Sequence, residues 1–158
     1  MSNEPNDYLD NLELFSSLPE EDKKILSTSL VVKTFEPQTD ICSQGEVATS
    51  CYIILEGVVR VLLVPDHTND VPVDSEQLIA TLDQNEFFGE VALLQGGTRS
   101  ATCRSGPKGV TVAVLGREEF DHILQSKNTF AYRLLDVISA QLARYTLTSI
   151  DSLGELID

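Results

Sequence analysis

One stretch of the chain, Phe87 to Thr102, combines residue types that could bind a phosphorylated sugar. An arginine guanidinium, such as that of Arg99, can hold a phosphate through two parallel hydrogen bonds, in a geometry that lysine cannot copy. A carboxylate such as that of Glu90 can accept a hydrogen bond from a sugar hydroxyl, as acidic residues do toward ribose in dinucleotide sites. Gly89 lacks a Cβ atom, so the backbone there can approach a ligand closely. These three residues are therefore the first candidates for a binding site.

The residues between these candidates would bring them together. A brief helical turn at 90–94 would leave backbone N–H groups near Val91 and Ala92 without partners inside the turn, and such a helix end can bind an anion. The two glycines at 96–97 would then turn the chain so that Arg99 returns to the same place.

The same residues also allow a simpler interpretation, in which Glu90 and Arg99 form an ion pair across a turn and bind nothing. Exposed pairs of this kind are common and contribute only about 0–1 kcal/mol. Against it, an arginine that is buried without an anion would be costly, so a buried Arg99 would favour a ligand.

The remainder of the chain up to residue 115 predicts mostly short strands. Apolar segments are separated by turn signals, such as Glu56-Gly57 and the polar loop from Pro65 to Ser75. Many short strands separated in this way are typical of an antiparallel roll or barrel. The predicted strands are residues 31–35, 41–43, 50–55, 58–64 and 77–82, a strand leading into Gly89, and residues 101–104 and 110–115.

Helices are predicted on both sides of this strand-rich region. On the N-terminal side, Pro19 suits a first helical turn, and Leu26 and Leu30 give that short helix a small apolar face. On the C-terminal side, residues 118–125 predict a short helix and residues from Thr129 onward a long one.

Charge and composition limit the partners that the chain could have. Its 158 residues include 11 Lys and Arg against 25 Asp and Glu, which gives a formal net charge of −14. An acidic chain repels phosphate backbones and anionic membranes, so we expect no DNA binding and no membrane binding. The N-terminus has no signal-peptide pattern, and no apolar run is long enough to span a bilayer. We therefore expect a cytoplasmic protein.

Cysteine and histidine usage predicts neither a metal centre nor a cofactor. The three cysteines, Cys42, Cys51 and Cys103, are widely spaced, and His67 and His122 form no H-x-H pattern. Metal sites need clustered ligands, so buried, reduced thiols are the expectation. Near Arg99 the spacing offers neither a nucleophile nor a paired acid and base, so the sequence does not predict an enzyme.

Three motifs in order resemble those of the cyclic nucleotide-binding domain family. F-G-E-V-A-L at 88–93, followed after five residues by R-S-A-T at 99–102, resembles its phosphate-binding cassette. Ser43-Gln44-Gly45-Glu46 resembles its G-[ED] turn, and the segment 52–57 its Y-I-[IL]-x-x-G strand. The similarity covers residues 12–149. It implies a mainly β fold with flanking helices: an eight-stranded antiparallel β-roll, similar to a jelly roll, with a short N-terminal and a long C-terminal helix.

The resemblance assigns roles within the cassette. Glu90 would bind the ribose 2′-hydroxyl and Arg99 the cyclic phosphate, and backbone N–H groups with the Ser100 hydroxyl would complete the phosphate shell. Thr98 stands where many members have proline, which would loosen the approach to Arg99 without removing a ligand contact. The implied ligand-binding residues are Gly89, Glu90, Val91, Ala92, Arg99, Ser100 and Ala101.

The long C-terminal helix also resembles a known element. Residues 139–144 and Thr148-Ser149 are similar to the dimerisation helix of the catabolite activator protein family, in which a Thr–Ser pair contacts adenine. The match is offset by about one residue, so either Thr148 or Ser149 could contact the base, and Tyr145 could instead stack on it. A spacing of three and four residues predicts a homodimer seam. Its members are Leu135, Ile138, Leu142 and Tyr145.

The resemblance leads to one expectation and two alternatives. We expect a stand-alone receptor, similar to a catabolite activator effector domain without the DNA-binding domain, that prefers cAMP and signals through its C-terminal helix to a protein partner or a dimer. Ser100 fits cGMP as well, so a cGMP-selective receptor is one alternative, and a dimerisation module that binds no nucleotide is the other. The predicted division is a flexible acidic tail at 1–10, the nucleotide-binding β-roll at 11–127 and a helix for dimerisation or closure at 128–158.

Overall fold

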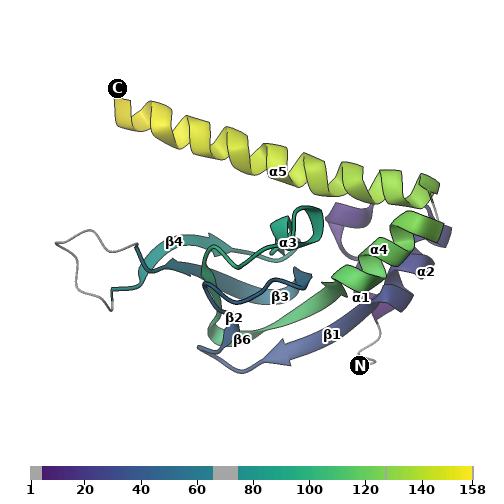
Figure 1. The fold of residues 1–158 in the computed structure, drawn as a ribbon, viewed down its shortest axis with the longest axis horizontal. Coiled ribbons are helices and arrows are strands. Elements are labelled where there is room, and N and C mark those ends of the chain that lie inside the picture. Colours follow the sequence, from purple (N-terminus) through teal and green to yellow (C-terminus); the bar gives the residue numbers. More distant parts are fainter. Residues whose placement is uncertain (1–4, 66–74, 127, 158) are drawn as a thin grey trace.

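The computed structural model describes residues 5–65, 75–126 and 128–157, with the side chains of residues 6, 14, 92, 93, 128 and 144–157 outside the description. A long helix lies across one side of a strongly bent sheet, and shorter helices gather at one end of it (Figure 1). The helices are α1 (Pro5–Leu9), the 3-10 turn η1 (Glu13–Phe15), α2 (Glu20–Ser29), α3 (Val91–Leu94), α4 (Arg117–Ser126) and α5 (Asn128–Ile157). The strands are β1 (Leu30–Phe35), β2 (Asp40–Cys42), β3 (Ser50–Leu63), β4 (Gln77–Leu82), β5 (Phe87–Phe88) and β6 (Thr102–Gly116).

The strands form an antiparallel sheet in the order β1-β6-β3-β4, with β2 paired to β6 and β5 paired to β3. Strands that are far apart in the chain are thus paired, as β1 and β3 are with β6, and the two longest strands, β3 and β6, form the centre of the sheet. The predicted class, mainly antiparallel β with flanking helices, is confirmed.

The described residues contain six strands where the sequence analysis expected eight, because two predicted pairs of strands are continuous. β3 joins 50–55 to 58–64, and β6 joins 101–104 to 110–115. Gly57 has a φ of 94° and lies where the register between the two strands shifts. A Cβ atom on Gly57 would lie 2.7 Å from the Gly109 carbonyl oxygen. Glycine therefore lets both strands bend through a bulge at this point rather than end in a turn.

The N-terminal segment differs from the predicted flexible tail. Residues 5–9 form α1, and Leu9 is buried in the core. Tyr8 also packs against this core, together with Leu12 and Phe15. Apolar side chains within an otherwise acidic segment are buried here, which explains why composition alone predicted a tail.

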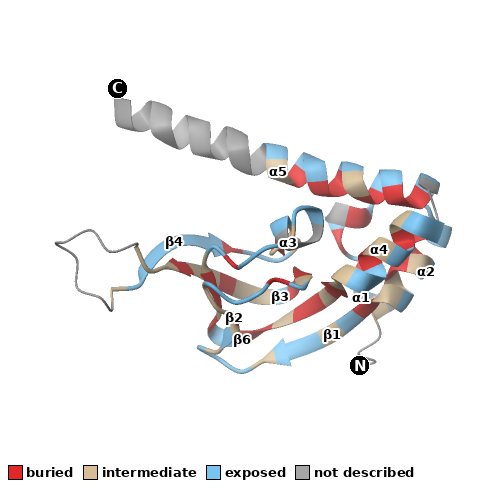
Figure 2. Ribbon diagram, in the orientation of Figure 1, coloured by how far each residue is buried: buried red, intermediate tan, exposed pale blue. Residues whose placement is uncertain are grey.

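Two clusters of buried side chains form the core. One lies inside the roll and includes Tyr52, Phe88 and Val112. The other lies between the sheet and the helices and includes Phe15 and Leu134. Figure 2 shows that the buried positions of the first half of α5 face the rest of the chain. The position of α5 is therefore fixed, in this half, by core packing.

This packing bears on the predicted dimer seam. Ile138 is only 2% exposed and belongs to the core of its own chain, and Leu135 and Leu142 pack against the same cluster. The prediction that Ile138 meets a second copy is therefore corrected, because this residue packs in the chain's own core. Leu135 and Leu142 are only partly buried, so their contact with a second copy stays a prediction. The side chain of Tyr145 lies outside the described residues.

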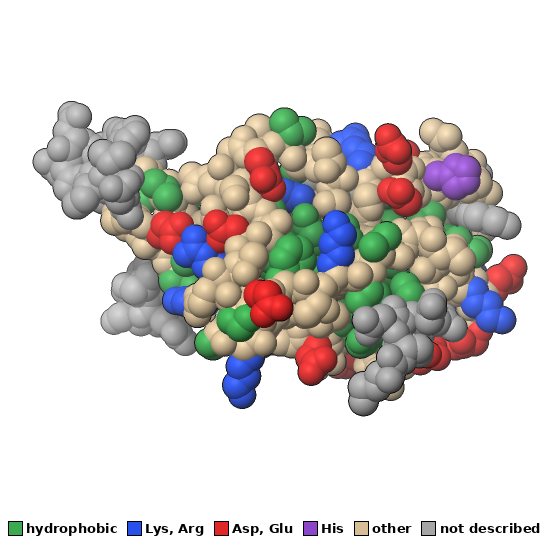
Figure 3. Space-filling model, turned by 90° about the horizontal axis from the view of Figure 1, so that it is seen from below, with side chains coloured by type: hydrophobic (Ala, Val, Ile, Leu, Met, Phe, Trp, Pro, Cys, Tyr) green, Lys and Arg blue, Asp and Glu red, His purple; other side chains and the backbone are tan. Residues whose placement is uncertain are grey.

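The surface carries charges of both signs. On the face seen from below, acidic and basic side chains lie interspersed around hydrophobic ones (Figure 3). Of the helices in the described ranges, none combines the length and the apolar character needed to cross a bilayer.

Candidate functional site

The segment that carries Arg99 is fixed by a neighbouring turn of the chain. The Gly45 N–H donates to the Arg99 carbonyl oxygen at 2.8 Å, and the Arg99 N–H donates to the Glu46 carbonyl oxygen at 2.8 Å. The Ala48 N–H donates to the Gly97 carbonyl oxygen at 2.9 Å. We call residues 43–48 the mounting turn, because its backbone holds the backbone of residues 97–99 in a short antiparallel ladder.

The Arg99 side chain is directed inward. Its Nη2 donates to the Ser50 carbonyl oxygen at 2.8 Å and its Nη1 to the Gly89 carbonyl oxygen at 3.4 Å. The guanidinium carbon lies 5.4 Å from the centre of the Tyr52 ring, within the range of a cation–π contact. Arg99 is only 8% exposed, and its buried Nε has no hydrogen-bond partner.

The groups that contact the buried Arg99 guanidinium are therefore two backbone carbonyls and an aromatic ring. Among the ion pairs of the described residues, none includes Arg99 or Glu90. The simpler interpretation, an ion pair across the turn, does not describe this geometry. Backbone carbonyls and an aromatic ring neutralise a guanidinium only partly, so the arrangement leaves Arg99 able to bind an anion.

Glu90 lies at the point where β5 leads into α3, and its side chain is partly buried. Burial raises the pKa of the Glu90 carboxyl above its ordinary value, while a hydrogen bond to its own backbone and the Arg99 charge act in the opposite direction. The Arg99 charge thus influences the pKa of the Glu90 carboxyl, although the two side chains form no ion pair.

The other predicted ligand-binding residues surround these two. Gly89 has a φ of 76° and lies against the Arg99 guanidinium. The side chains of Val91 and Ser100 are exposed, and Ala101 is partly buried. Ala92 is in α3, and its side chain lies outside the described residues.

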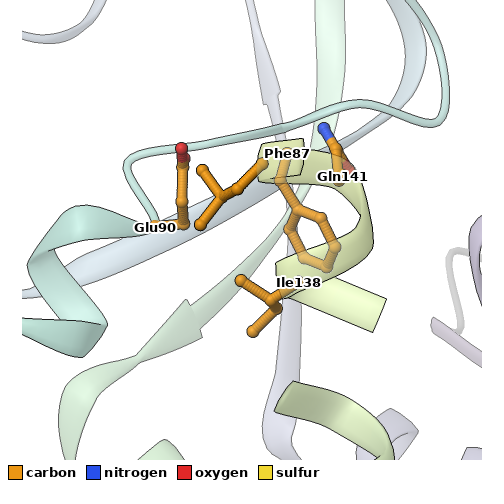
Figure 4. Close-up of a pocket in the computed structure, with 5 residues that line it drawn as sticks. Phe87, Glu90, Ile138 and Gln141 are labelled. Carbon is orange, nitrogen blue, oxygen red and sulfur yellow. The ribbon is translucent and has the colours of Figure 1, made fainter. Parts of the chain in front are cut away.

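A small crevice beside Glu90 connects the site to the long helix. It is lined by Phe87, Glu90, Ile138, Gln141 and Leu142 (Figure 4) and leaves almost no room even for a water molecule. Ligand pockets are usually far larger. α5 therefore lies close over this part of the site. The predicted base contacts, Tyr145, Thr148 and Ser149, continue along α5, but their side chains lie outside the described residues.

Sequence reasoning missed the partners of Arg99 and the contribution of Gln141. Tyr52 was recognised only as part of a strand motif, and Ser50 acts through its backbone, which leaves no signal in the sequence. Gln141 is 4% exposed and lines the crevice. In the sequence, the only indication of this role is that Gln141 directly precedes Leu142, a residue of the predicted apolar face of the helix.

Comparison with known proteins agrees with this geometry. The family model described as the cyclic nucleotide-binding domain matches residues 32–127. The chain is 29% identical over 156 residues to a cGMP-dependent protein kinase of Toxoplasma gondii, covering 98% of this chain and 14% of the kinase. It is 29% identical over 117 residues to a cAMP-dependent protein kinase regulatory subunit of Yarrowia lipolytica, covering 74% of this chain and 28% of that subunit.

A solved structure shows the same fold. The crystal structure of a cyclic nucleotide-binding domain from Methylobacillus flagellatus superposes with a TM-score of 0.79 at 21% identity, over 96% of this chain and 82% of that one. The chain spans less than a third of the length of each of these two curated relatives. From the family match over most of the roll, together with the fold and the cassette, the chain belongs to the cyclic nucleotide-binding domain family.

Proposed function

We propose that this chain binds a cyclic nucleoside monophosphate and acts as a receptor rather than as an enzyme. In this proposal Arg99 holds the cyclic phosphate and Glu90 accepts a hydrogen bond from the ribose 2′-hydroxyl. The Ser100 hydroxyl and the backbone N–H groups near Val91 and Ala92 complete the phosphate shell. A chain that provides a buried cation and a separate carboxylate has the two groups that distinguish a phosphorylated ribose from simpler anions.

The buried Arg99 guanidinium is the observation that carries this proposal. It is only 8% exposed, bonds to two backbone carbonyls and leaves its Nε without a partner. Removing a charge from water costs several kcal/mol unless an opposite charge compensates it. An anionic ligand at this position would supply that charge and use the free donor.

The preference for cAMP is the finer part of the proposal. It is supported by the similarity of residues 139–144 to the helix of the catabolite activator family. A cGMP receptor is the second candidate, because Ser100 suits it and the similar kinase of Toxoplasma gondii is cGMP-dependent. In either case we propose that Thr148 or Ser149 contacts the base, or that Tyr145 stacks on it, and that α5 passes the signal to a second copy or another protein in the cytoplasm.

Isothermal titration calorimetry with cAMP, cGMP and AMP tests the proposal. We expect binding of a cyclic nucleotide, tighter for cAMP than for cGMP, and much weaker binding of AMP. A folded protein that gives no heat with either cyclic nucleotide would leave only the module that binds no nucleotide.

The substitution Arg99→Lys tests the phosphate contact. Lysine keeps the charge but loses the planar fork, so we expect affinity to fall roughly 10- to 100-fold, the equivalent of about 1.5–3 kcal/mol for hydrogen bonds to a charged group. Arg104→Lys is the matched control, because Arg104 pairs with Asp40 and Glu76 away from the site. Equal affinities of the Arg99→Lys and Arg104→Lys proteins would refute the assignment.

A further inference from the structure

Two of the three cysteines face each other across neighbouring strands. Cys42, the last residue of β2, is in register with Cys103 on the antiparallel strand β6. Both thiols are buried in the same core cluster, and both cysteines are in the reduced state. Directly opposed residues of antiparallel strands have Cα atoms about 4.5–5.5 Å apart, and a disulfide accepts about 4.4–6.8 Å. The pair is therefore within reach of a disulfide, but a register shift between Asp40 and Cys42 interrupts the ladder beside it, so forming the bond requires the two strands to adjust.

The cysteine pair adjoins the residues that position Arg99. Cys42 immediately precedes the mounting turn (residues 43–48). Within that turn, the Gln44 N–H donates to the hydroxyl of Thr102, the neighbour of Cys103, at 3.0 Å. The next residue, Gly45, donates to the Arg99 carbonyl oxygen at 2.8 Å. A change in the separation of β2 and β6 at Cys42 is therefore transmitted within three residues to the backbone of Arg99.

The electrostatics of the pair favour reaction at Cys42. Hydrogen bonding with Cys103 lowers the pKa of the Cys42 thiol to about 7, against the effect of burial, and the Arg99 charge lowers it further. The same interaction and burial raise the pKa of Cys103. Of the two thiols, Cys42 is therefore the more readily ionised. The third cysteine differs, because burial raises the pKa of Cys51.

We propose that Cys42 and Cys103 are a reversible oxidation site, at which a peroxide forms a disulfide that weakens nucleotide binding by moving the mounting turn. The effect on binding rests on the proposed function, whereas the formation of the disulfide does not. β2 has only three residues and pairs with β6, so a local opening of this short strand gives the oxidant access.

The reaction balances with hydrogen peroxide as oxidant. The Cys42 thiolate attacks one peroxide oxygen, the O–O bond breaks, and a sulfenic acid and hydroxide form. The Cys103 sulfur then attacks the Cys42 sulfur, the S–S bond forms, and the sulfenic oxygen leaves as water with the Cys103 proton. The two thiols are oxidised by two electrons in total, and the peroxide is reduced to water and hydroxide.

Peptide mapping by mass spectrometry of the full chain, before and after hydrogen peroxide, tests the site. We expect one linked peptide pair containing Cys42 and Cys103, two hydrogen atoms lighter than the separate peptides and reversed by dithiothreitol. The Cys51→Ser protein is the matched control and should form the same linkage. A linkage through Cys51, a linkage between two chains, over-oxidised thiols alone, or no oxidation would each overturn the proposal.

Calorimetry on the reduced and the oxidised protein tests the effect on binding. We expect the oxidised protein to bind its cyclic nucleotide about tenfold more weakly, a coupling typical of linked sites, and dithiothreitol to restore the affinity. The Cys103→Ser protein, which cannot form the disulfide, should not show this reversible loss. Equal affinity of the reduced protein and the protein with the mapped disulfide would refute the coupling. If the reduced protein binds no cyclic nucleotide, the proposed function fails, and peptide mapping alone then decides the oxidation site.

Discussion

At the scale of single residues, the position of the Arg99 guanidinium depends on a neighbour that has no side chain. A Cβ atom built on Gly89 would lie 2.5 Å from Arg99 Nη1 and 3.3 Å from the Ser50 carbonyl oxygen that accepts from the same guanidinium. Gly89 also has a φ of 76°, a conformation that glycine adopts without strain. The glycine of the cassette thus makes room for the arginine of the cassette.

The substitution Gly89→Ala tests this close approach. The new methyl group would displace the guanidinium, so we expect cyclic-nucleotide affinity to fall at least about tenfold, in addition to a backbone strain of about 1–3 kcal/mol. Gly97→Ala is the matched control, because Gly97 also has a positive φ, of 102°, but nothing lies within 4 Å of its added Cβ. Binding and unfolding measured on both proteins separate the two effects. Equal losses of affinity would show that backbone strain, not displacement of Arg99, is responsible.

The second prediction for single residues concerns the proposed hydrogen bond between Glu90 and the ribose 2′-hydroxyl. The parent protein should bind 2′-deoxy-cAMP roughly 10- to 100-fold more weakly than cAMP, because a hydrogen bond to a carboxylate is lost. In the Glu90→Gln protein this ratio should shrink toward one, and calorimetry with both ligands measures it. A ratio that Glu90→Gln leaves unchanged would place the ribose contact elsewhere.

The raised pKa of Glu90 also predicts how the free energy of unfolding changes with pH. Burial raises the pKa of its carboxyl above the ordinary 4.5, so the folded chain binds this proton more tightly than the unfolded chain does. The resulting stabilisation is complete below the unfolded pKa and is lost as pH rises through the higher folded pKa. As pH rises from about 4 through the folded pKa of Glu90, the free energy of unfolding of the Glu90→Gln protein should therefore rise relative to that of the parent. Urea unfolding across this range measures the difference, which would stay constant if Glu90 did not titrate differently in the folded chain.

At the scale of elements, α5 is held by an ion pair as well as by its apolar face. Arg133 Nη1 lies 2.6 Å from Asp22 Oδ2, which joins α5 to α2. Asp22 is only 6% exposed. Further along α5, Ile138 and Gln141 reach the crevice beside Glu90. The ion pair and the core therefore fix the start of the helix whose continuation lies over the site.

The substitution Arg133→Met tests this anchor. It keeps the apolar stem but leaves the Asp22 carboxylate buried without its partner, so we expect a loss of about 1–3 kcal/mol in the free energy of unfolding. Lys24→Met is the control, because it removes an exposed positive charge from the same helix α2. Denaturant unfolding should show little change for the control. An unchanged stability of the Arg133→Met protein would mean that core packing alone positions α5.

At the scale of the whole molecule, the site that we propose for the ligand includes residues from both core clusters. Tyr52, beneath the guanidinium, belongs to the cluster inside the roll, and Phe87, in the crevice, belongs to the cluster under the helices. A ligand held between them stabilises the folded chain as a unit, because it binds the folded state only.

Thermal unfolding with added nucleotide tests this prediction. At a cAMP concentration of about 100 Kd the stabilisation should be about 2.7 kcal/mol, which corresponds to a rise in Tm of roughly 5–10 °C for a chain of this length. AMP at the same concentration should give a much smaller shift. Equal shifts with AMP and cAMP would indicate an anion effect rather than recognition of the cyclic nucleotide.

The fold class and the position of the cassette could both be predicted from the amino-acid sequence. Both depend on local patterns: short apolar segments between turn signals, and residues such as Gly89 and Arg99 at fixed spacing in one stretch. The spacing of α5 predicted a long helix correctly, because periodicity reports which side of a helix is apolar. Which surface covers that side is not encoded in the spacing, so Ile138 was assigned to a dimer but packs in its own core.

The contacts between distant segments become visible only in the folded chain. The Arg99 guanidinium bonds to Ser50, 49 residues away, and Cys42 faces Cys103 because β2 pairs with β6. The continuity of β3 through Gly57 also depends on its pairing with β6, since a glycine permits a turn and a bulge equally well. Strand pairing over long sequence separations is set by the packing of the whole roll, and it is this packing that determines what the cassette residues contact.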